Sequence, residues 1–198
     1  MIKINVCGVE LTFEPREVIL PEYGSVVLKL MEKENLPRVK KAILESMNRS
    51  PEQKEVSEKM LRSDLERWKY NEESYLFLIG SDTKNNVLGV TNGNVLELGD
   101  EICGQSIRTL NTSGAKGVGI ELFKAKLEAL FSSKEIEIVY ADPLRGSRKG
   151  KKMLEYFGFD PTPRGKHYKL FLTCRIFLCG DWGEPYSLTR EYYMKLKK

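Results

Sequence analysis

The order of the hydrophobic patterns limits the possible folds of this chain more than any other feature. Three strand-like segments follow one another in the middle of the chain, and a strand and two amphipathic helices precede them. After these strands the pattern alternates between helix and strand. In chain order the patterns are 26–30 (strand), 36–47 and 50–68 (helices), 75–79, 87–98 and 102–110 (strands), 118–131 (helix), 136–140 (strand), 147–157 (helix) and 167–171 (strand). This order predicts a mixed β-sheet flanked by helices, an α/β or α+β fold.

The length of 198 residues suits one domain with decorated ends. We expect an N-terminal arm or hairpin over 1–24, a main domain over 25–173, and a C-terminal extension over 174–198 packed on the same domain. No stretch of 18 apolar residues predicts a membrane span, and the first residues do not resemble a signal peptide. The sequence therefore predicts a cytoplasmic protein without membrane contact.

Cysteine and histidine give little support for metal or triad chemistry. The chain has 4 Cys and 1 His, and only Cys174 and Cys179 lie close together in sequence. We therefore expect no metal site and no catalytic triad built on His167. The net charge, 32 − 28 = +4, is too small to indicate a nucleic-acid partner by itself.

A glycine-rich segment, Gly114-Ala115-Lys116-Gly117-Val118-Gly119, joins the strand at 102–110 to the next helix. Small residues let the backbone approach a ligand, and the start of a helix presents N–H groups and a positive dipole end. A pyrophosphate fits such a loop, and Thr109 and Asn111 lie just before it. A plain glycine turn before a helix is the alternative interpretation.

A basic segment, Arg145-Gly146-Ser147-Arg148-Lys149-Gly150-Lys151-Lys152, follows the strand at 136–140. Five of its eight residues are cationic. A strand–helix–strand unit returns to the same end of the sheet, so this segment and the glycine loop are expected at one edge. Two phosphate-binding segments at one edge indicate a ligand with several phosphates. A solvated basic helix face and a contact with RNA or DNA are the alternatives.

In this order of strands, the two segments resemble those of the GNAT N-acyltransferases. The family's pyrophosphate loop reads Gln/Arg-x-x-Gly-x-Gly/Ala, which Gly117 and Gly119 match, whereas Gly114 replaces the first residue. The later family pattern, Asn-x-x-Ala followed by Tyr and Gly-Phe, aligns without a gap to 147–159. Gly158-Phe159 match, and Ser147, Gly150 and Leu154 stand at the Asn, Ala and Tyr positions. The resemblance covers roughly 25–172.

The resemblance implies a GNAT-like sheet and transfer of an acetyl group from acetyl-CoA to an amine of a small molecule, peptide or protein. It implies donor contacts from Thr109, Asn111, the loop Gly114–Gly119, Ser147, Arg148 and Lys149. The family's tyrosine, which protonates the departing thiolate, is replaced by Leu154, so Ser147 and Tyr140 are candidate acids. Glu101, at the start of the strand before the loop, is the candidate base.

Simpler roles compete with these assignments. Ser147 would serve as a helix cap, Tyr140 as core packing, and Glu101 as part of an exposed turn. Two other functions also stay open: a catalytically weak GNAT-like protein that binds a partner through its added termini, and a nucleic-acid binder that uses 145–152. The sequence is compatible with a monomer or a homodimer.

Overall fold

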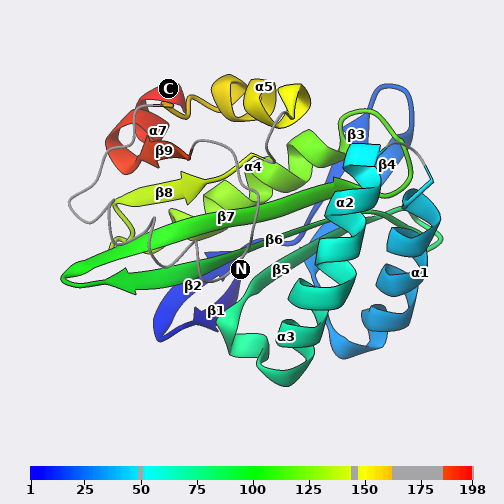
Figure 1. Cartoon of the computed structure of the whole chain (residues 1–198), viewed down its shortest axis with the longest axis horizontal. Helices are drawn as coiled ribbons and strands as arrows, with labels where there is room; N and C mark the ends of the chain where they lie inside the picture. The colour runs from blue at the N-terminus through cyan, green and yellow to red at the C-terminus, as the bar shows by residue number, and fades with distance from the viewer. Residues whose placement is uncertain (49–50, 144–146, 162–184, 198) are drawn as a thin grey trace.

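A seven-stranded mixed sheet forms the centre of the computed structural model, which describes residues 1–48, 51–143, 147–161 and 185–197 (Figure 1). Within these residues the strands lie in chain order across the sheet, and neighbours are antiparallel except for the parallel pair β7 and β8. The strands are β3 (Arg16–Leu20), β4 (Gly24–Leu30), β5 (Leu76–Ser81), β6 (Val87–Leu98), β7 (Glu101–Asn111), β8 (Ile138–Ala141) and β9 (Tyr186–Thr189). The predicted mixed sheet flanked by helices is thereby confirmed.

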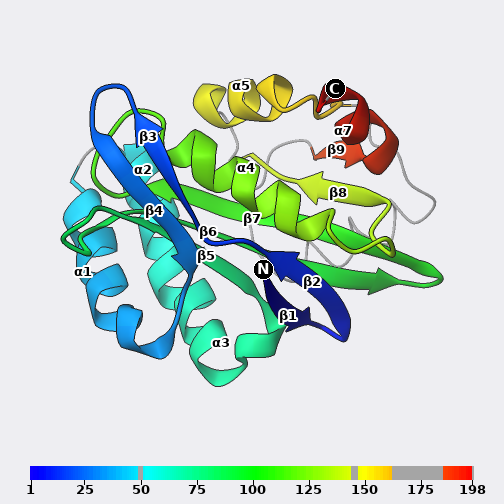
Figure 2. The same ribbon diagram turned by 180° about the vertical axis from the view of Figure 1, so that it is seen from behind.

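Alternation along β5, the third strand of the sheet, divides the core into two layers. Phe77 and Ile79 face the layer of helices that lie between β4 and β5 in the chain, and Leu76 and Leu78 face the opposite layer. The first layer consists of α1 (Leu36–Ser46), α2 (Pro51–Lys59), a π-helical turn (Met60–Asp64) and α3 (Leu65–Tyr70), with short 3-10 turns at Lys33–Asn35 and Glu72–Ser74. The opposite layer contains α4 (Val118–Leu130) and the hairpin of β1 (Ile2–Val6) and β2 (Val9–Phe13), as Figure 2 shows from behind.

The two ends of the chain both add to this frame. In the predicted arm 1–24, the hairpin packs against α4, and β3 extends the main sheet as an edge strand. At the other end, β9 pairs with β8 and leads into α7 (Arg190–Leu196), which lies near α5 (Arg148–Tyr156) in Figure 1. The strand expected at 167–171, Cys174, Cys179 and the basic residue Arg145 lie outside the described residues.

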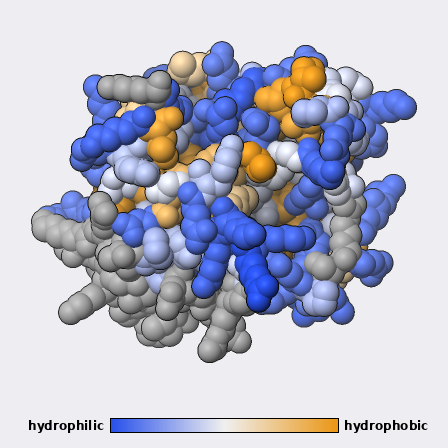
Figure 3. All heavy atoms as spheres, turned by 90° about the horizontal axis from the view of Figure 1, so that it is seen from above, coloured by the Kyte–Doolittle hydropathy of each residue, from blue (hydrophilic) through white to orange (hydrophobic). Residues whose placement is uncertain are grey.

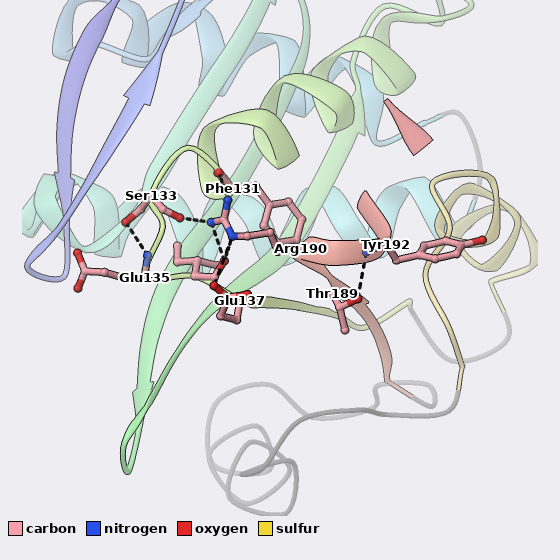
Figure 4. Close-up of polar contacts among 8 residues, drawn as sticks. Phe131, Ser133, Glu135, Glu137, Thr189, Arg190 and Tyr192 are labelled. Atoms are coloured by element: carbon pink, nitrogen blue, oxygen red, sulfur yellow. Dashed lines mark hydrogen bonds and ion pairs between the residues drawn. The ribbon is translucent and has the colours of Figure 1, made fainter. Parts of the chain in front are cut away.

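Arg190 fastens the C-terminal segment to the connection between α4 and β8 (Figure 4). Its guanidinium donates hydrogen bonds to the carbonyl oxygens of Phe131 and Ile136, both at 2.8 Å, and to that of Ser133. The backbone N–H of Arg190 also donates to the carbonyl of Glu137 at 2.8 Å. One side chain thus satisfies carbonyls that the end of α4 and the following turn leave without a helical partner.

The pairing of β7 creates the feature that positions the site. β7 pairs with β8 only from Cys103 to Ser106, although β7 continues to Asn111. The register between β6 and β7 shifts at Asn92/Gly93, which leaves Ile107 as an extra residue. β8 ends at Ala141, opposite Ser106, and no described strand pairs with the β8-side edge of β7 beyond that point. None of the helices in the described ranges is long and apolar enough to cross a membrane.

Candidate active site

A cavity of about 260 Å³ lies beside the part of β7 that continues past the end of β8. Its floor is the segment Ser106–Asn111 of β7, and α2, α4 and α5 supply its walls. Alternation along β7 turns Leu110 toward the layer of α1 and α3, whereas the Thr109 hydroxyl contacts Lys126 of α4. The cavity is therefore lined from both faces of the sheet and curves around the edge of β7, so two molecules could approach one point from opposite faces.

Asn111, the last residue of β7, organises the glycine-rich loop. Its Oδ1 accepts hydrogen bonds from the backbone N–H of Ser113 and Gly114, at 3.2 and 2.8 Å. Its Nδ2 donates to the carbonyl of Ala115 at 2.6 Å. These contacts hold the loop against the end of β7. As a result, the first turn of α4 lies beside the cavity.

Two glycines shape the start of α4. Gly117 has φ +90°, a left-handed conformation that favours glycine, and its position as N-cap brings no side-chain hydrogen bond to the first turn. A Cβ at Gly119 would meet only the Thr109 methyl group, at 4.0 Å, so the cavity is open at this point. The first turn of α4 thus offers N–H groups without a side-chain cap and the positive end of the helix dipole. The exposed ammonium of Lys116 pairs with Glu22 at 2.9 Å, outside the cavity lining.

The start of α5 forms the wall across from α4. Ser147 caps this helix, since its Oγ accepts a hydrogen bond from the backbone N–H of Gly150 at 2.9 Å. Lys149 is exposed yet lines the cavity, whereas Arg148 is exposed and does not line it. Leu154 is buried at the cavity wall, so the position of the family tyrosine contributes only apolar surface.

Seen from above, hydrophilic side chains cover most of the described surface, and hydrophobic atoms appear in small separate groups (Figure 3).

The first turn of α2 closes the cavity from the other face of the sheet. Gln53 Nε2 donates to the carbonyl of Asn111 at 3.1 Å, which ties this turn to the end of β7. The preceding residue, Glu52, accepts a hydrogen bond from the hydroxyl of Ser147. One contact between Glu52 and Ser147 therefore joins α2 to α5 across the cavity.

A buried ion pair lies beneath the α2 wall. Arg108 of β7 donates to the carboxylate of Asp64, which also accepts a hydrogen bond from Asn92 Nδ2 at 3.2 Å. Asp64 and Arg108 are 3% and 7% exposed, so both charges are removed from bulk water and neutralise each other. Asp64 ends the π-helical turn, an irregularity that is frequent at functional sites.

Lys126 of α4 is the second buried charge-bearing residue of the lining. Its Nζ contacts the Thr109 hydroxyl at 3.1 Å and the carbonyl oxygens of Asn92 and Arg108, both at 3.3 Å. The same atom lies 4.7 Å from the centre of the Phe123 ring. Desolvation by complete burial holds the pKa of this ammonium group well below its usual range. Lys126 therefore contacts both strands at the register shift between β6 and β7 and stabilises their backbone there.

The structure brings together part of the predicted site. Five predicted donor-binding residues line the cavity: Thr109, Asn111, Gly119, Ser147 and Lys149. The segment Gly114–Val118 forms the adjacent loop and helix start, outside the lining itself.

The other two predicted catalytic residues lie elsewhere. Glu101 begins β7, opposite Leu98, and lies five strand positions, or about 17 Å, before Ser106, the first β7 residue of the lining. Tyr140 is fully buried in a cluster with Leu98, Cys103 and Ile138 and is not part of the lining. Glu101 and Tyr140 therefore lie outside the cavity lining, and their catalytic roles stay predictions from the sequence.

Sequence reasoning missed Glu52, Arg108 and Lys126. A signal existed for Lys126, which stands four residues from both Leu122 and Leu130 and so occupies the apolar face of its helix. Glu52 and Arg108 had no comparable signal, because their place at the site depends on contacts distant in sequence.

Comparison with solved structures identifies the fold. The GNAT domain of S. lividans PAT has a TM-score of 0.61 at 12% identity, over 88% of this chain and 96% of that one. Aminoglycoside acetyltransferase AAC(6')-Ib, in complex with coenzyme A and kanamycin, has a TM-score of 0.56 at 18% identity, over 87% and 99%. Spermidine N-acetyltransferase from Vibrio cholerae, in complex with coenzyme A and spermine, has a TM-score of 0.54 at 12% identity, over 85% and 98%.

The chain thus has the fold of the GNAT acetyltransferases, and the resemblance noted in its sequence is confirmed at the level of the fold. No protein-family model and no curated protein sequence matches the chain.

Proposed function

We propose that this protein is an acyl-CoA-dependent N-acyltransferase that moves an acetyl group from acetyl-CoA to an amine. The observation that supports this most is the cavity beside β7 past the end of β8, because it is lined from both faces of the sheet. A donor and an acceptor that enter from opposite faces would meet at the edge of β7.

The donor side is the wall of α4 and α5. The uncapped first turn of α4 and the open space at Gly119 suit a pyrophosphate, and Lys149 adds a cation from α5. The edge of β7 beyond Ser106 offers a row of backbone groups that would pair with the amides of the pantetheine arm. Apolar side chains of Phe123 and Met153 complete this wall.

The acceptor side is the wall of α2. In the described lining Glu52 is the carboxylate on this wall, and Asp142, just after β8, is the other lining carboxylate. Arg108 is neutralised by Asp64. Such a wall favours a cationic acceptor, because Glu52 would bind an ammonium group and the apolar Val56 and Leu110 would contact its carbon chain. The structural neighbours bound to kanamycin and spermine act as precedents for polycationic acceptors in this fold.

The main task of the protein in this reaction is to orient the amine against the thioester carbonyl. The amine nitrogen attacks the thioester carbonyl carbon, and backbone N–H groups at the extra residue of β7 would stabilise the negative oxygen that forms. Bound ligands that displace water from the cavity would strengthen each of these interactions. Thiolate is a good leaving group, so collapse of the intermediate requires only modest assistance.

The test is product formation. The purified chain is incubated with acetyl-CoA and, in separate reactions, spermine, kanamycin and a lysine-containing peptide, and thiol release is followed together with the mass of the amine. The proposal predicts amine-dependent thiol release with a gain of one acetyl group on the acceptor. Binding of acetyl-CoA without acetylation of any amine in this panel would contradict it in favour of a binding protein of the same fold.

A further inference from the structure

We infer that Glu52 and Ser147 form a single proton relay that connects the attacking amine to the departing sulfur. This inference rests on the proposed function and adds a catalytic assignment to it. Such a relay would perform the work of a separate base and acid, and it accounts for Leu154 at the position where the family places tyrosine.

The geometry of the pair supports a relay. Glu52 and Ser147 both line the cavity, Glu52 from α2 on the acceptor wall and Ser147 from α5 on the donor wall. Ser147 donates its hydroxyl proton to Glu52 and accepts the N–H of Gly150 at 2.9 Å. The proton of Ser147 is therefore already directed toward the carboxylate before any ligand binds.

The residues around Ser147 and Glu52 favour the proton-transfer role of each. The N–H of Gly150 and the positive end of the α5 dipole stabilise negative charge on the Ser147 oxygen, which makes its hydroxyl a better proton donor. Ser147 is 6% exposed, so bulk water does not compete freely for this proton. Glu52 is fixed because the neighbouring Gln53 ties the first turn of α2 to the carbonyl of Asn111.

The proton balance of the step is closed. The attacking amine is uncharged, its ammonium form having lost one proton to bulk water. As its nitrogen bonds to the carbonyl carbon, it becomes positively charged and releases one proton to the carboxylate of Glu52. When the carbon–sulfur bond breaks, the electron pair stays on sulfur, and Ser147 gives its hydroxyl proton to that thiolate. In the same concerted step Glu52 passes the proton it holds to the Ser147 oxygen, because a free alkoxide is a much stronger base than a thiolate. The products are the amide and the free thiol of CoA, and both residues regain their starting states.

The experiment separates catalysis from structure by matched variants. Glu52→Gln removes the base, and Ser147→Asn keeps a residue that caps helices well but lacks a hydroxyl proton. Ser147→Thr retains both the cap and the hydroxyl. Glu55→Gln is the control, because Glu55 lies on the same helix, pairs with Lys59 and does not line the cavity. Thermal melting and titration with CoA verify that each variant is folded and binds the donor.

The relay predicts that Glu52→Gln and Ser147→Asn each lower kcat by about 100-fold at unchanged donor affinity, which is the usual contribution of general acid–base catalysis. The kcat of the double variant Glu52→Gln/Ser147→Asn is no more than about 3-fold below that of Glu52→Gln, because the two residues act as one unit. Ser147→Thr restores most of the turnover, and Glu55→Gln leaves it unchanged. In mixtures of light and heavy water, the wild-type rate gives a curved dependence, as expected for two protons in transit.

Other outcomes overturn the inference. Turnover that is unchanged in Glu52→Gln, or equally low in Ser147→Thr and Ser147→Asn, refutes the relay while leaving acyl transfer intact. Multiplicative losses in the double variant also refute it, because they show independent roles. Failure of the wild-type chain to release thiol with spermine, kanamycin and the lysine peptide removes the proposed function and the relay together.

Discussion

Replacing Lys126 with methionine should change how the stability of the protein depends on pH. The Nζ of Lys126 is enclosed by Thr109, two backbone carbonyls and the Phe123 ring, and burial lowers its pKa. In the unfolded chain the same group regains an ordinary lysine pKa near 10.5. Between the two pKa values the unfolded chain therefore holds one more proton than the folded chain at this position.

The sign of the effect follows from this difference. A fall in pH below 10.5 favours the unfolded chain, so the free energy of unfolding contributed by Lys126 rises as pH increases toward 10.5. The slope is about 1.4 kcal/mol for each pH unit above the folded pKa. From pH 8 to pH 10, the free energy of unfolding of the wild-type chain should therefore rise by up to about 2.7 kcal/mol relative to that of Lys126→Met.

Urea unfolding followed by circular dichroism, at several pH values from 7.5 to 10, measures this difference directly. Subtracting the variant from the wild type cancels titrations elsewhere in the chain, and Lys124→Met, an exposed lysine on the same helix, controls for removal of a positive charge. If the difference in the free energy of unfolding between wild type and Lys126→Met stays constant across this pH range, the argument is refuted, because Lys126 would then keep its proton in the folded chain.

Further predictions follow from single contacts. Arg190→Ala leaves the carbonyls of Phe131, Ser133 and Ile136 without their donor and should lower stability by about 2–3 kcal/mol in urea unfolding, with any loss under 0.5 kcal/mol contradicting this. Lys149→Glu should weaken CoA binding at least about 10-fold in low salt, whereas Lys152→Glu, outside the lining, should change it little; equal effects would argue against a specific contact. Gly119→Leu should fold and abolish CoA binding, because the side chain enters open cavity space; retained binding would move the donor elsewhere. Gly89→Ala should cost about 1–3 kcal/mol of stability, since a Cβ would meet Val118 at 2.7 Å, and wild-type stability would show that α4 shifts freely.

Local sequence patterns predicted the elements well, because hydrophobic periodicity depends on which face each element buries. Val87–Leu98 and Glu101–Asn111 form long strands, and α4 begins directly after the glycine loop as expected. The parallel return of β8 also brings Gly119 and Lys149 to one cavity, as the strand–helix–strand argument predicts.

The catalytic assignments were harder, because they depend on distances along strands and on contacts between distant segments. Glu101 begins its strand five positions before the lining residue Ser106, so the local pattern alone does not place it at the cavity, and its role as base stays a prediction. Glu52 enters the site only because α2 crosses to α5, a contact between residues 95 apart in sequence. No local pattern encodes such a contact.

Calorimetric titration of the wild-type chain with acetyl-CoA and with free CoA, at low and high salt, tests the central claim most directly. The account predicts micromolar binding of both ligands that weakens with salt, because the phosphates contact the α4 start and Lys149. Absence of binding at millimolar concentrations of either ligand would contradict it, since the cavity at the edge of β7 would then not be a donor site.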